Sequence, residues 1–184
     1  RYIMNKIQGN TIIGTLCTEF EPQVTEPIVT EATTPPVTTA ETTTTTEVTT
    51  PEPPKEMIYY GCDGQIFNGI TETVNGGFLG QSYVNFDNVM GSSLTFTVNA
   101  PSDGNYELTV RFANGTTAAR PLNVFVNGSN DSYFMNFDGT GAWTDWSENK
   151  IVVSLKQGEN KIKMVATTSN GGPNVDLIKL IATD

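Results

Sequence analysis

Apolar and polar residues alternate along most of the chain after residue 55. In the clearest run, Leu94, Phe96 and Val98 alternate with Thr95 and Thr97. A period of two predicts strands with one face buried and the other in water. No stretch shows a convincing period of 3.6 residues, so we do not expect a helical core. The same alternation recurs at 106–112, 122–126, 151–155, 162–166 and 175–181.

Turn-forming residues separate these apolar runs. They include Pro-Ser-Asp-Gly at 101–104, Asn-Gly-Ser-Asn-Asp at 127–131 and Lys-Gln-Gly-Glu-Asn at 156–160. Many short strands with regular turns predict an all-β fold, a sandwich of two antiparallel sheets. The 130 residues from 55 to 184 are enough chain for one such domain and its core.

The chain before this domain has a different composition. Residues 18–54 contain 14 Thr, 7 Pro and 7 Glu, with no Lys or Arg, so they cannot bury a core. We interpret them as an extended, disordered linker that could span on the order of 100 Å. A disordered tail with no spacing role is the alternative. Residues 1–17 are either a leader or the end of an upstream domain, and the sequence does not decide.

The charge and residue counts exclude several kinds of chemistry. The chain has 184 residues, 20 acidic and 10 basic, for a net charge of −10, but the domain 55–184 carries only −5 of it. The absence of histidine excludes Ser-His-Asp and Cys-His catalysis and histidine metal ligands. An acidic chain is a poor nucleic-acid binder. No apolar run approaches the roughly 20 residues of a membrane span. The function classes that remain are a binding protein and an enzyme that uses carboxylates or a metal held by oxygen ligands.

Six blocks of the domain occur in an order that resembles the family 35 carbohydrate-binding modules, with the related family 6 second. The resemblance runs from about residue 57 to residue 182. It implies a β-jelly roll of two packed antiparallel sheets, no catalysis, and a sugar site in the loops at one edge. The blocks are GFLGQSYV (77–84), RFANG (111–115), RPLNVFVNG (120–128), GTGAWTDW (139–146), LKQGENKI (155–162) and GGPNVD (171–176).

The chain has two tryptophans, Trp143 and Trp146. Sugar binding needs an aromatic platform together with fixed polar groups. The resemblance assigns the platform to Trp143. On a strand, residues three apart face opposite ways, so we expect Trp146 to pack in the core. The alternative is that both tryptophans are structural.

Two asparagines are implied as sugar contacts. Asn174 would hydrogen-bond sugar hydroxyls, since its amide can both donate and accept. Its alternative role is an Asx-turn in the loop at 171–173. The resemblance places Asn114 at the rim of the site, whereas the Asn-Gly pair formed with Gly115 equally favours a β-turn.

Arg120 and Phe78 complete the implied sugar site. In relatives that bind uronic acids a basic residue matches the sugar carboxylate, and Arg120 could grip that group bidentately. The alternative is a surface arginine paired with a carboxylate. Phe78 stands where the family often has a second aromatic wall. We expect Tyr83 to begin a strand and pack inside.

The sequence departs from the family at its structural calcium site. Family members usually carry two Glu in the opening strand, which hold calcium together with a late Asp, here Asp176. In this chain Tyr60 and Cys62 stand where the two Glu would be. We therefore expect calcium to be weak, displaced or absent, and Asp63 alone not to replace the lost ligands.

Cys17 and Cys62 are the two cysteines of the chain. They could form a disulfide, or Cys62 could be a small buried apolar residue. Because Cys17 lies outside the domain with the family resemblance, we expect two unpaired thiols.

The resemblance implies a secreted or extracellular bacterial protein. The module, a monomer, would target an attached enzyme to plant cell-wall polysaccharide with uronic acid, mannose or galactose units. One alternative is a structural or adhesion domain with a degenerate sugar site. Another is a glycoside hydrolase or lyase using two of the carboxylates Asp138, Asp145 and Glu148.

Overall fold

The computed structural model describes residues 11–12 and 55–183. The chain divides into two units, Arg1–Cys17 with Pro54–Asp184 and Thr18–Pro53. The predicted disordered linker, 18–54, and all but two residues of the segment 1–17 lie outside the described residues.

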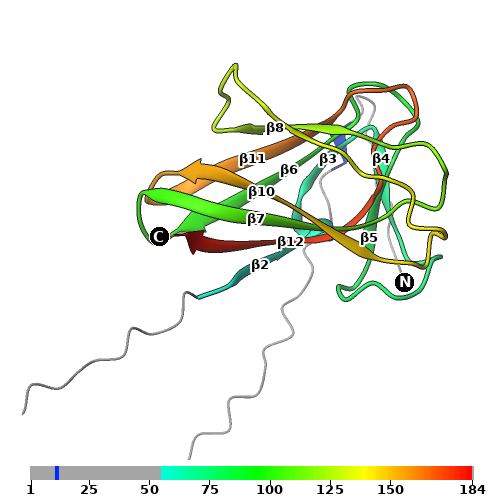
Figure 1. Ribbon diagram of the computed structural model, residues 1–184, viewed down its shortest axis with the longest axis horizontal. Coiled ribbons are helices and arrows are strands. Elements are labelled where there is room, and N and C mark those ends of the chain that lie inside the picture. Colours follow the sequence, from blue (N-terminus) through cyan, green and yellow to red (C-terminus); the bar gives the residue numbers. More distant parts are fainter. Residues whose placement is uncertain (1–10, 13–54, 184) are drawn as a thin grey trace, which may run out of the picture. The chain divides into compact units, whose positions relative to one another are not determined.

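The described residues form an all-β structure with a single turn of 3₁₀ helix, η1 (Figure 1). This confirms the predicted fold class. The elements are β1 (Thr11–Ile12), β2 (Met57–Tyr60), η1 (Gly61–Asp63), β3 (Gln65–Phe67), β4 (Gly69–Glu72), β5 (Tyr83–Phe86), β6 (Ser93–Ala100), β7 (Gly104–Ala113), β8 (Leu122–Val126), β9 (Tyr133–Met135), β10 (Ser147–Leu155), β11 (Gly158–Ala166) and β12 (Asn174–Thr183).

These strands make two antiparallel sheets that pack face to face as the predicted jelly-roll sandwich. One sheet has the order β1-β3-β6-β11-β8-β9. The other has the order β10-β7-β12-β5-β4, with β2 paired to β12. Strand β12 is therefore central in its sheet, between β7 on one side and β2 and β5 on the other.

The core lies between the sheets and follows the period-two pattern of the sequence. On β6, Leu94, Phe96 and Val98 are each at most 2% exposed, while Thr97 is exposed. The pattern changes on β12, where the residues from Val175 to Ile178 are all buried. Strand β12 has neighbours along both edges and is buried on both faces over this stretch, which includes the carboxylate of Asp176, so the period of two is lost there.

The start of the domain differs from the expected opening strand. Strand β2 ends at Tyr60, and η1 carries Cys62 out of the sheet. The short strand β1 pairs with β3, with Thr11 opposite Phe67. Among the described residues, no helix has the length and apolar character needed to cross a membrane.

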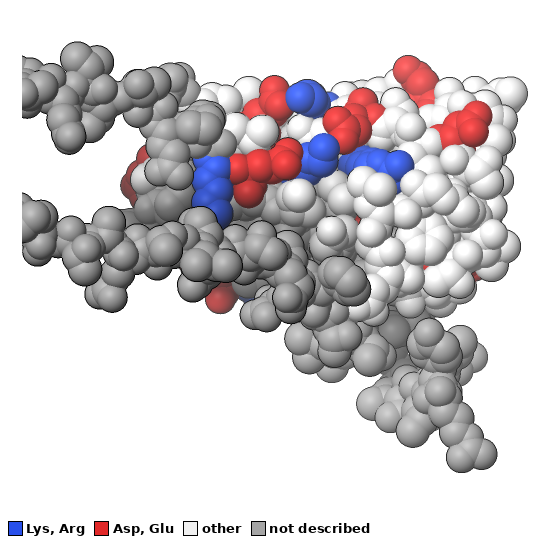
Figure 2. Space-filling model, turned by 90° about the horizontal axis from the view of Figure 1, so that it is seen from below, with Lys and Arg blue, Asp and Glu red and all other residues white. Residues whose placement is uncertain are grey.

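Several connecting loops gather at the end of the sandwich where β12 begins (Figure 1). Hydrogen bonds and close packing contacts join the loops at 75–80, 114–120, 139–146 and 168–173. On the face seen in Figure 2, acidic and basic side chains are interspersed and form no separate basic patch.

Candidate functional site

Trp143 lies in the turn that precedes β10 and is half-buried. The premise that the two tryptophans lie on a strand is wrong, because β10 begins only at Ser147. A Cβ atom added to Gly115 would lie 2.5 Å from Cδ1 of Trp143, so the indole packs directly on this glycine. The Arg120 guanidinium carbon lies over the indole, 5.2 Å from the ring centroid. The ring is thus held by a glycine contact and a cation–π contact.

Arg120 is only 8% exposed and lies at the junction of two loops. Its Nη1 donates to Oδ1 of Asn88 at 3.0 Å, to the carbonyl of Asn170 and to the carbonyl of Gly172 at 3.2 Å. Burial lowers the pKa of the guanidinium. The alternative of a surface arginine paired with a carboxylate is wrong, since Arg120 forms no ion pair with any described residue.

The Arg120 guanidinium also has unused donors. Its Nε is buried without a hydrogen-bond partner in the part of the chain that the structure describes. Hydrogen bonds to other described residues come from Nη1 and not from Nη2. A buried guanidinium that pairs with no carboxylate in the described part of the chain is suited to an anionic ligand group.

Asn174 is the first residue of β12 and lies opposite Ala113 of β7. It is 2% exposed, yet no described residue forms a hydrogen bond with its side-chain amide. The amide is therefore free to donate to and accept from a ligand. It follows directly on the loop whose Gly172 carbonyl holds Arg120.

Asn114 directly follows β7, and its side chain is fully occupied inside the protein. Its Nδ2 donates to the carbonyls of Ala118 at 2.9 Å and Phe137 at 3.0 Å. Its Oδ1 accepts from the backbone N–H of Thr116 at 3.1 Å and from the Thr116 hydroxyl at 2.7 Å. With 0% exposure and both donors used, Asn114 orders the turn and is not at the rim of a sugar site.

Phe78 belongs to a second aromatic group. Its ring is 5.6 Å from Tyr83, and Tyr83 is 5.4 Å from Trp146. Tyr83 begins β5 at 0% exposure, which confirms its predicted place in the core. Trp146 is half-buried, donates from Nε1 to the Gly76 carbonyl and lines a surface groove, so it does not pack inside the core as expected. No ring or cation–π contact joins this group to Trp143 within the described residues.

The surroundings of Asp176 do not fit a calcium site. Its buried carboxylate accepts hydrogen bonds from the N–H groups of Leu79 at 2.9 Å and Gly80 at 3.1 Å, and it pairs with Arg111. A cation there would face the guanidinium charge. The described residues contain no group of three or more His, Cys, Asp or Glu placed to hold a metal.

Cys62 is 3% exposed and disulfide-bonded. The expectation of unpaired thiols is therefore wrong for Cys62, and Cys17 lies outside the described residues. A sulfur engaged in a disulfide has no thiolate to offer a metal.

A surface groove of about 400 Å³ lies beside Trp146 and contains the carboxylates considered for catalysis. Asp138, Asp145 and Glu148 are all exposed. Asp138 accepts from Asn136, and Glu148 is paired with Lys179 at 2.9 Å. The groove holds no carboxyl group in a dry pocket, which is the usual setting for a catalytic acid.

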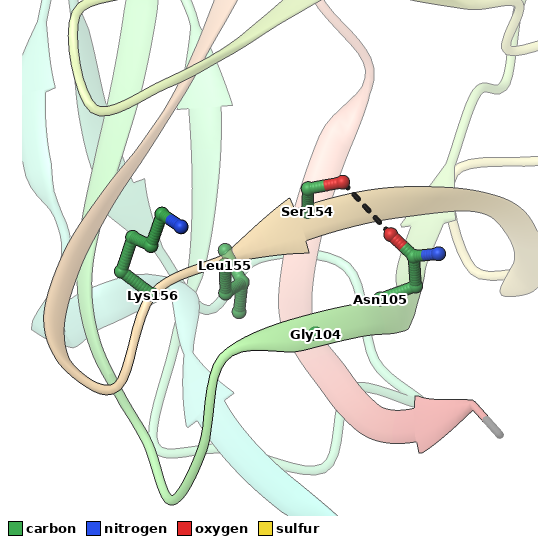
Figure 3. Close-up of a pocket in the computed structure, with 5 residues that line it drawn as sticks. All are labelled: Gly104, Asn105, Ser154, Leu155 and Lys156. Atoms are coloured by element: carbon green, nitrogen blue, oxygen red, sulfur yellow. Dashed lines mark hydrogen bonds between the residues drawn. The ribbon is translucent and has the colours of Figure 1, made fainter.

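A second, smaller pocket of about 250 Å³ lies where β7 begins and β10 ends (Figure 3). It is lined by residues such as Gly104, Leu155 and Lys156, and Ser154 donates to Asn105 at 2.8 Å across it. Its lining has no aromatic ring, so it lacks the platform that a sugar needs.

Comparison with known proteins identifies the family. The model of carbohydrate binding module family 6 matches residues 69–182. A solved family 35 module from Clostridium thermocellum is 48% identical, with a TM-score of 0.67, and the match covers 70% of this chain and 99% of that one. A family 35 module solved with a disaccharide containing glucuronic acid is 33% identical, with a TM-score of 0.65, and the match covers 70% of this chain and 94% of that one.

Curated enzymes also contain similar segments. An exo-β-D-glucosaminidase from Amycolatopsis orientalis is 48% identical over 71% of this chain and 13% of its own length. Endo-1,4-β-xylanase B from Cellvibrio japonicus is 39% identical over 65% of this chain and 19% of its own length. The chain thus spans less than a fifth of these relatives. From the family model, the solved relatives and the fold together, we conclude that the chain belongs to the carbohydrate-binding modules, of the family 35 type.

Proposed function

We propose that this module binds polysaccharides or oligosaccharides that carry uronic acid, through Trp143, Asn174 and Arg120. The observation that carries the proposal is the half-buried indole packed against the buried Arg120 guanidinium, which pairs with no carboxylate among the described residues. The indole suits the apolar C–H face of a sugar. The guanidinium suits its carboxylate, and the free amide of Asn174 suits its hydroxyls.

The charge of Arg120 favours uronic acid over the other expected sugars, mannose and galactose. Neutral sugars would leave the buried charge uncompensated, whereas a carboxylate compensates it. The solved relative with a disaccharide containing glucuronic acid supports this choice.

Affinity electrophoresis in gels containing soluble polysaccharides tests the proposal. Polysaccharides with uronic acid should retard the module, and Trp143→Ala should abolish the retardation. Phe134→Ala is the matched control, because Phe134 is an aromatic residue on β9 that is 62% exposed and lies outside the proposed contacts. No retardation by any glycan would favour a structural or adhesion domain, and release of reducing sugar would indicate a catalyst.

The role of the charge is tested by changing the ligand, since a buried arginine cannot be replaced without disturbing the fold. A disaccharide containing glucuronic acid should bind at least about tenfold more tightly than its carboxyl-reduced counterpart. Equal affinities for the two disaccharides would show that Arg120 does not bind the sugar carboxylate.

The proposal extends to a tethered enzyme in a secreted, extracellular protein, with the module as a monomer. Xylanase B and the other curated relatives support it, because they carry the similar segment as a small part of a longer enzyme. Binding would raise the enzyme's effective concentration on polysaccharide without changing its chemistry. Fused to a xylanase without a binding module, the chain should raise the rate on insoluble cell-wall material and leave the rate on soluble oligosaccharides unchanged.

A further inference from the structure

Asp176 is a fully buried carboxylate in the middle of the second sheet. It lies on β12, which it shares with Asn174, at a point where the register between β12 and β7 shifts. Its two oxygens accept from the backbone N–H groups of Leu79 and Gly80, in the loop that carries Phe78. A buried carboxylate needs such donors together with a positive charge.

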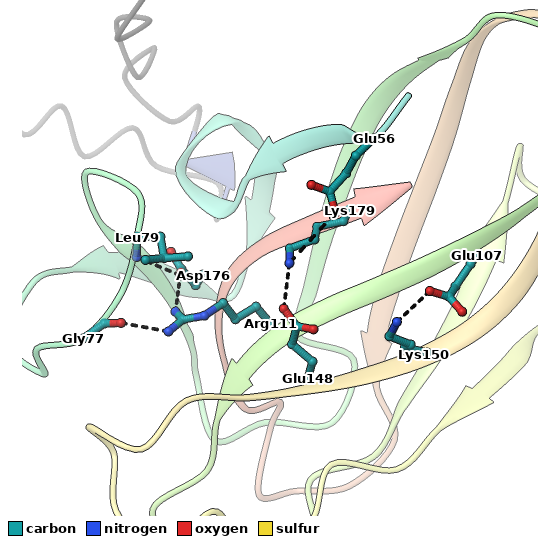
Figure 4. A network of polar contacts seen from close by, with 9 residues as sticks. All are labelled: Glu56, Gly77, Leu79, Glu107, Arg111, Glu148, Lys150, Asp176 and Lys179. Atoms are coloured by element: carbon teal, nitrogen blue, oxygen red, sulfur yellow. Dashed lines mark hydrogen bonds and ion pairs between the residues drawn. The ribbon is translucent and has the colours of Figure 1, made fainter. Parts of the chain in front are cut away.

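Arg111 on β7 supplies that charge and reaches the same loop (Figure 4). Its Nη1 pairs with Asp176, and its Nη2 donates to the Gly77 carbonyl at 2.9 Å. The guanidinium carbon also lies 5.1 Å from the centroid of the Trp146 ring. One guanidinium therefore connects the carboxylate, the loop backbone and an aromatic side chain.

The loop 76–80 is consequently held at four backbone groups. Asp176 binds two of its N–H groups, Arg111 binds one carbonyl, and Trp146 binds the Gly76 carbonyl at 2.9 Å. The ring of Tyr60 lies against Gly80, where an added Cβ atom would be 2.8 Å from the ring. Tyr60, which stands in place of a calcium-binding Glu, thus contacts the loop through its ring.

We propose that Arg111 and Asp176 form a clamp that positions the loop carrying Phe78 without a metal ion. The pair supplies the positive charge that calcium would otherwise bring to Asp176, and three donors already occupy the carboxylate oxygens. As positioning residues, the two act on sugar affinity through the loop. This last part rests on the proposed function and adds Phe78 to it, as the second aromatic wall that the family resemblance implies.

Amide hydrogen exchange tests the clamp without any sugar. In Asp176→Asn, the Leu79 and Gly80 amides should exchange at least about tenfold faster, while those of β6 and β11 keep their protection. Arg111→Lys keeps a charge beside Asp176 and should retain most of the protection, which a purely volume-based role would not predict. The matched control is Lys150→Met, which breaks an exposed ion pair with Glu107 on the same sheet. Unchanged exchange at Leu79 and Gly80 in Asp176→Asn would overturn the clamp.

Calcium is tested on the unaltered protein. Calcium chloride or EDTA should change its melting temperature by no more than about 1 °C, because an ion that does not bind the folded state cannot stabilise it. A rise of several degrees with calcium would refute the metal-free clamp, and loss of that rise in Asp176→Asn would identify Asp176 as a ligand of the ion. This arm decides the question even if a variant fails to fold.

The effect on sugar binding is tested by a double-mutant cycle. Asp176→Asn and Phe78→Ala should each weaken binding to a disaccharide containing glucuronic acid by about tenfold, because a loosened loop must be ordered on binding. The double variant should be no weaker than Phe78→Ala by more than about twofold. Independent losses would refute positioning through Phe78. If the unaltered module binds no sugar, the proposed function fails, and the exchange and calcium arms still decide the clamp.

Discussion

At the scale of single residues, Asn114 and Asn174 show how the same side chain takes opposite roles. The amide of Asn114 is used inside the protein, by two carbonyls and by Thr116. The amide of Asn174 has no partner among the described residues. Sequence alone left a ligand role and a turn role open for both, because the partners lie in loops that only the fold brings together.

The two asparagines should therefore respond differently to alanine. Asn114→Ala should lower the free energy of unfolding by about 1–3 kcal/mol, because the carbonyls of Ala118 and the buried Phe137 each lose one hydrogen-bond donor. Asn174→Ala should leave stability nearly unchanged and weaken sugar binding. Urea denaturation and calorimetric titration of both variants check this. A stability loss at Asn174 as large as that at Asn114 would contradict the assignment.

Tyr83 should make stability sensitive to alkaline pH. Burial, and to a smaller extent the nearby charge of Glu72, raises the pKa of its phenol. The folded state thus keeps the proton that the unfolded state releases near a pKa of about 10. The stabilisation is complete below that pH and is lost as the pH rises through the folded pKa.

The measurement is the loss in free energy of unfolding between pH 8 and pH 11. Tyr83→Phe should lose less stability over this range than the unaltered protein. Tyr133→Phe, at an exposed tyrosine on β9, is the control and should behave as the unaltered protein. Equal losses in all three proteins would contradict the prediction.

At the scale of elements, the strands could be predicted from the sequence and the functional loops could not. Alternation located β6, β7, β8, β10 and β11, since burial on one face imposes a period of two. The contact of Gly115 with Trp143 and the place of Arg120 under the indole depend on loop geometry. In the sequence, Gly115 indicated only a turn. In the structure, its lack of a side chain leaves room for the indole of Trp143.

Gly115→Ala tests that close approach. The added methyl group would lie 2.5 Å from Cδ1 of Trp143, so the indole must shift away from its position over Arg120. We expect sugar affinity to fall by at least about tenfold with a modest stability loss of about 1–3 kcal/mol. Gly128→Ala, in a distant turn with open space around the added atom, is a control for glycine replacement, although its positive φ of 70° adds backbone strain. Retention of full affinity in Gly115→Ala would contradict the platform geometry.

At the scale of the whole molecule, amino-acid composition divides the chain into a predicted linker at 18–54 and a domain at 55–184. The domain 55–184 has the apolar residues for a core. Its family resemblance is confirmed by the family model that matches residues 69–182 and by the solved relatives. The expectation about the cysteines failed at Cys62, because pairing in space cannot be deduced from sequence spacing. The role of residues 18–54 as a spacer stays a prediction.

The central claim is that the loops around Trp143 bind a sugar while the rest of the sandwich supports them. The most direct measurement is a two-dimensional ¹H–¹⁵N NMR titration with a disaccharide containing glucuronic acid. The account predicts saturable shifts of the Trp143 indole N–H and the Asn174 side-chain amide. The amides of Gly104 and Lys156 line the smaller pocket where β7 begins and β10 ends, here called the distal pocket, and they should not shift. Saturable shifts that cluster at the distal pocket, or no shifts at Trp143 and Asn174 at saturating sugar, would contradict it.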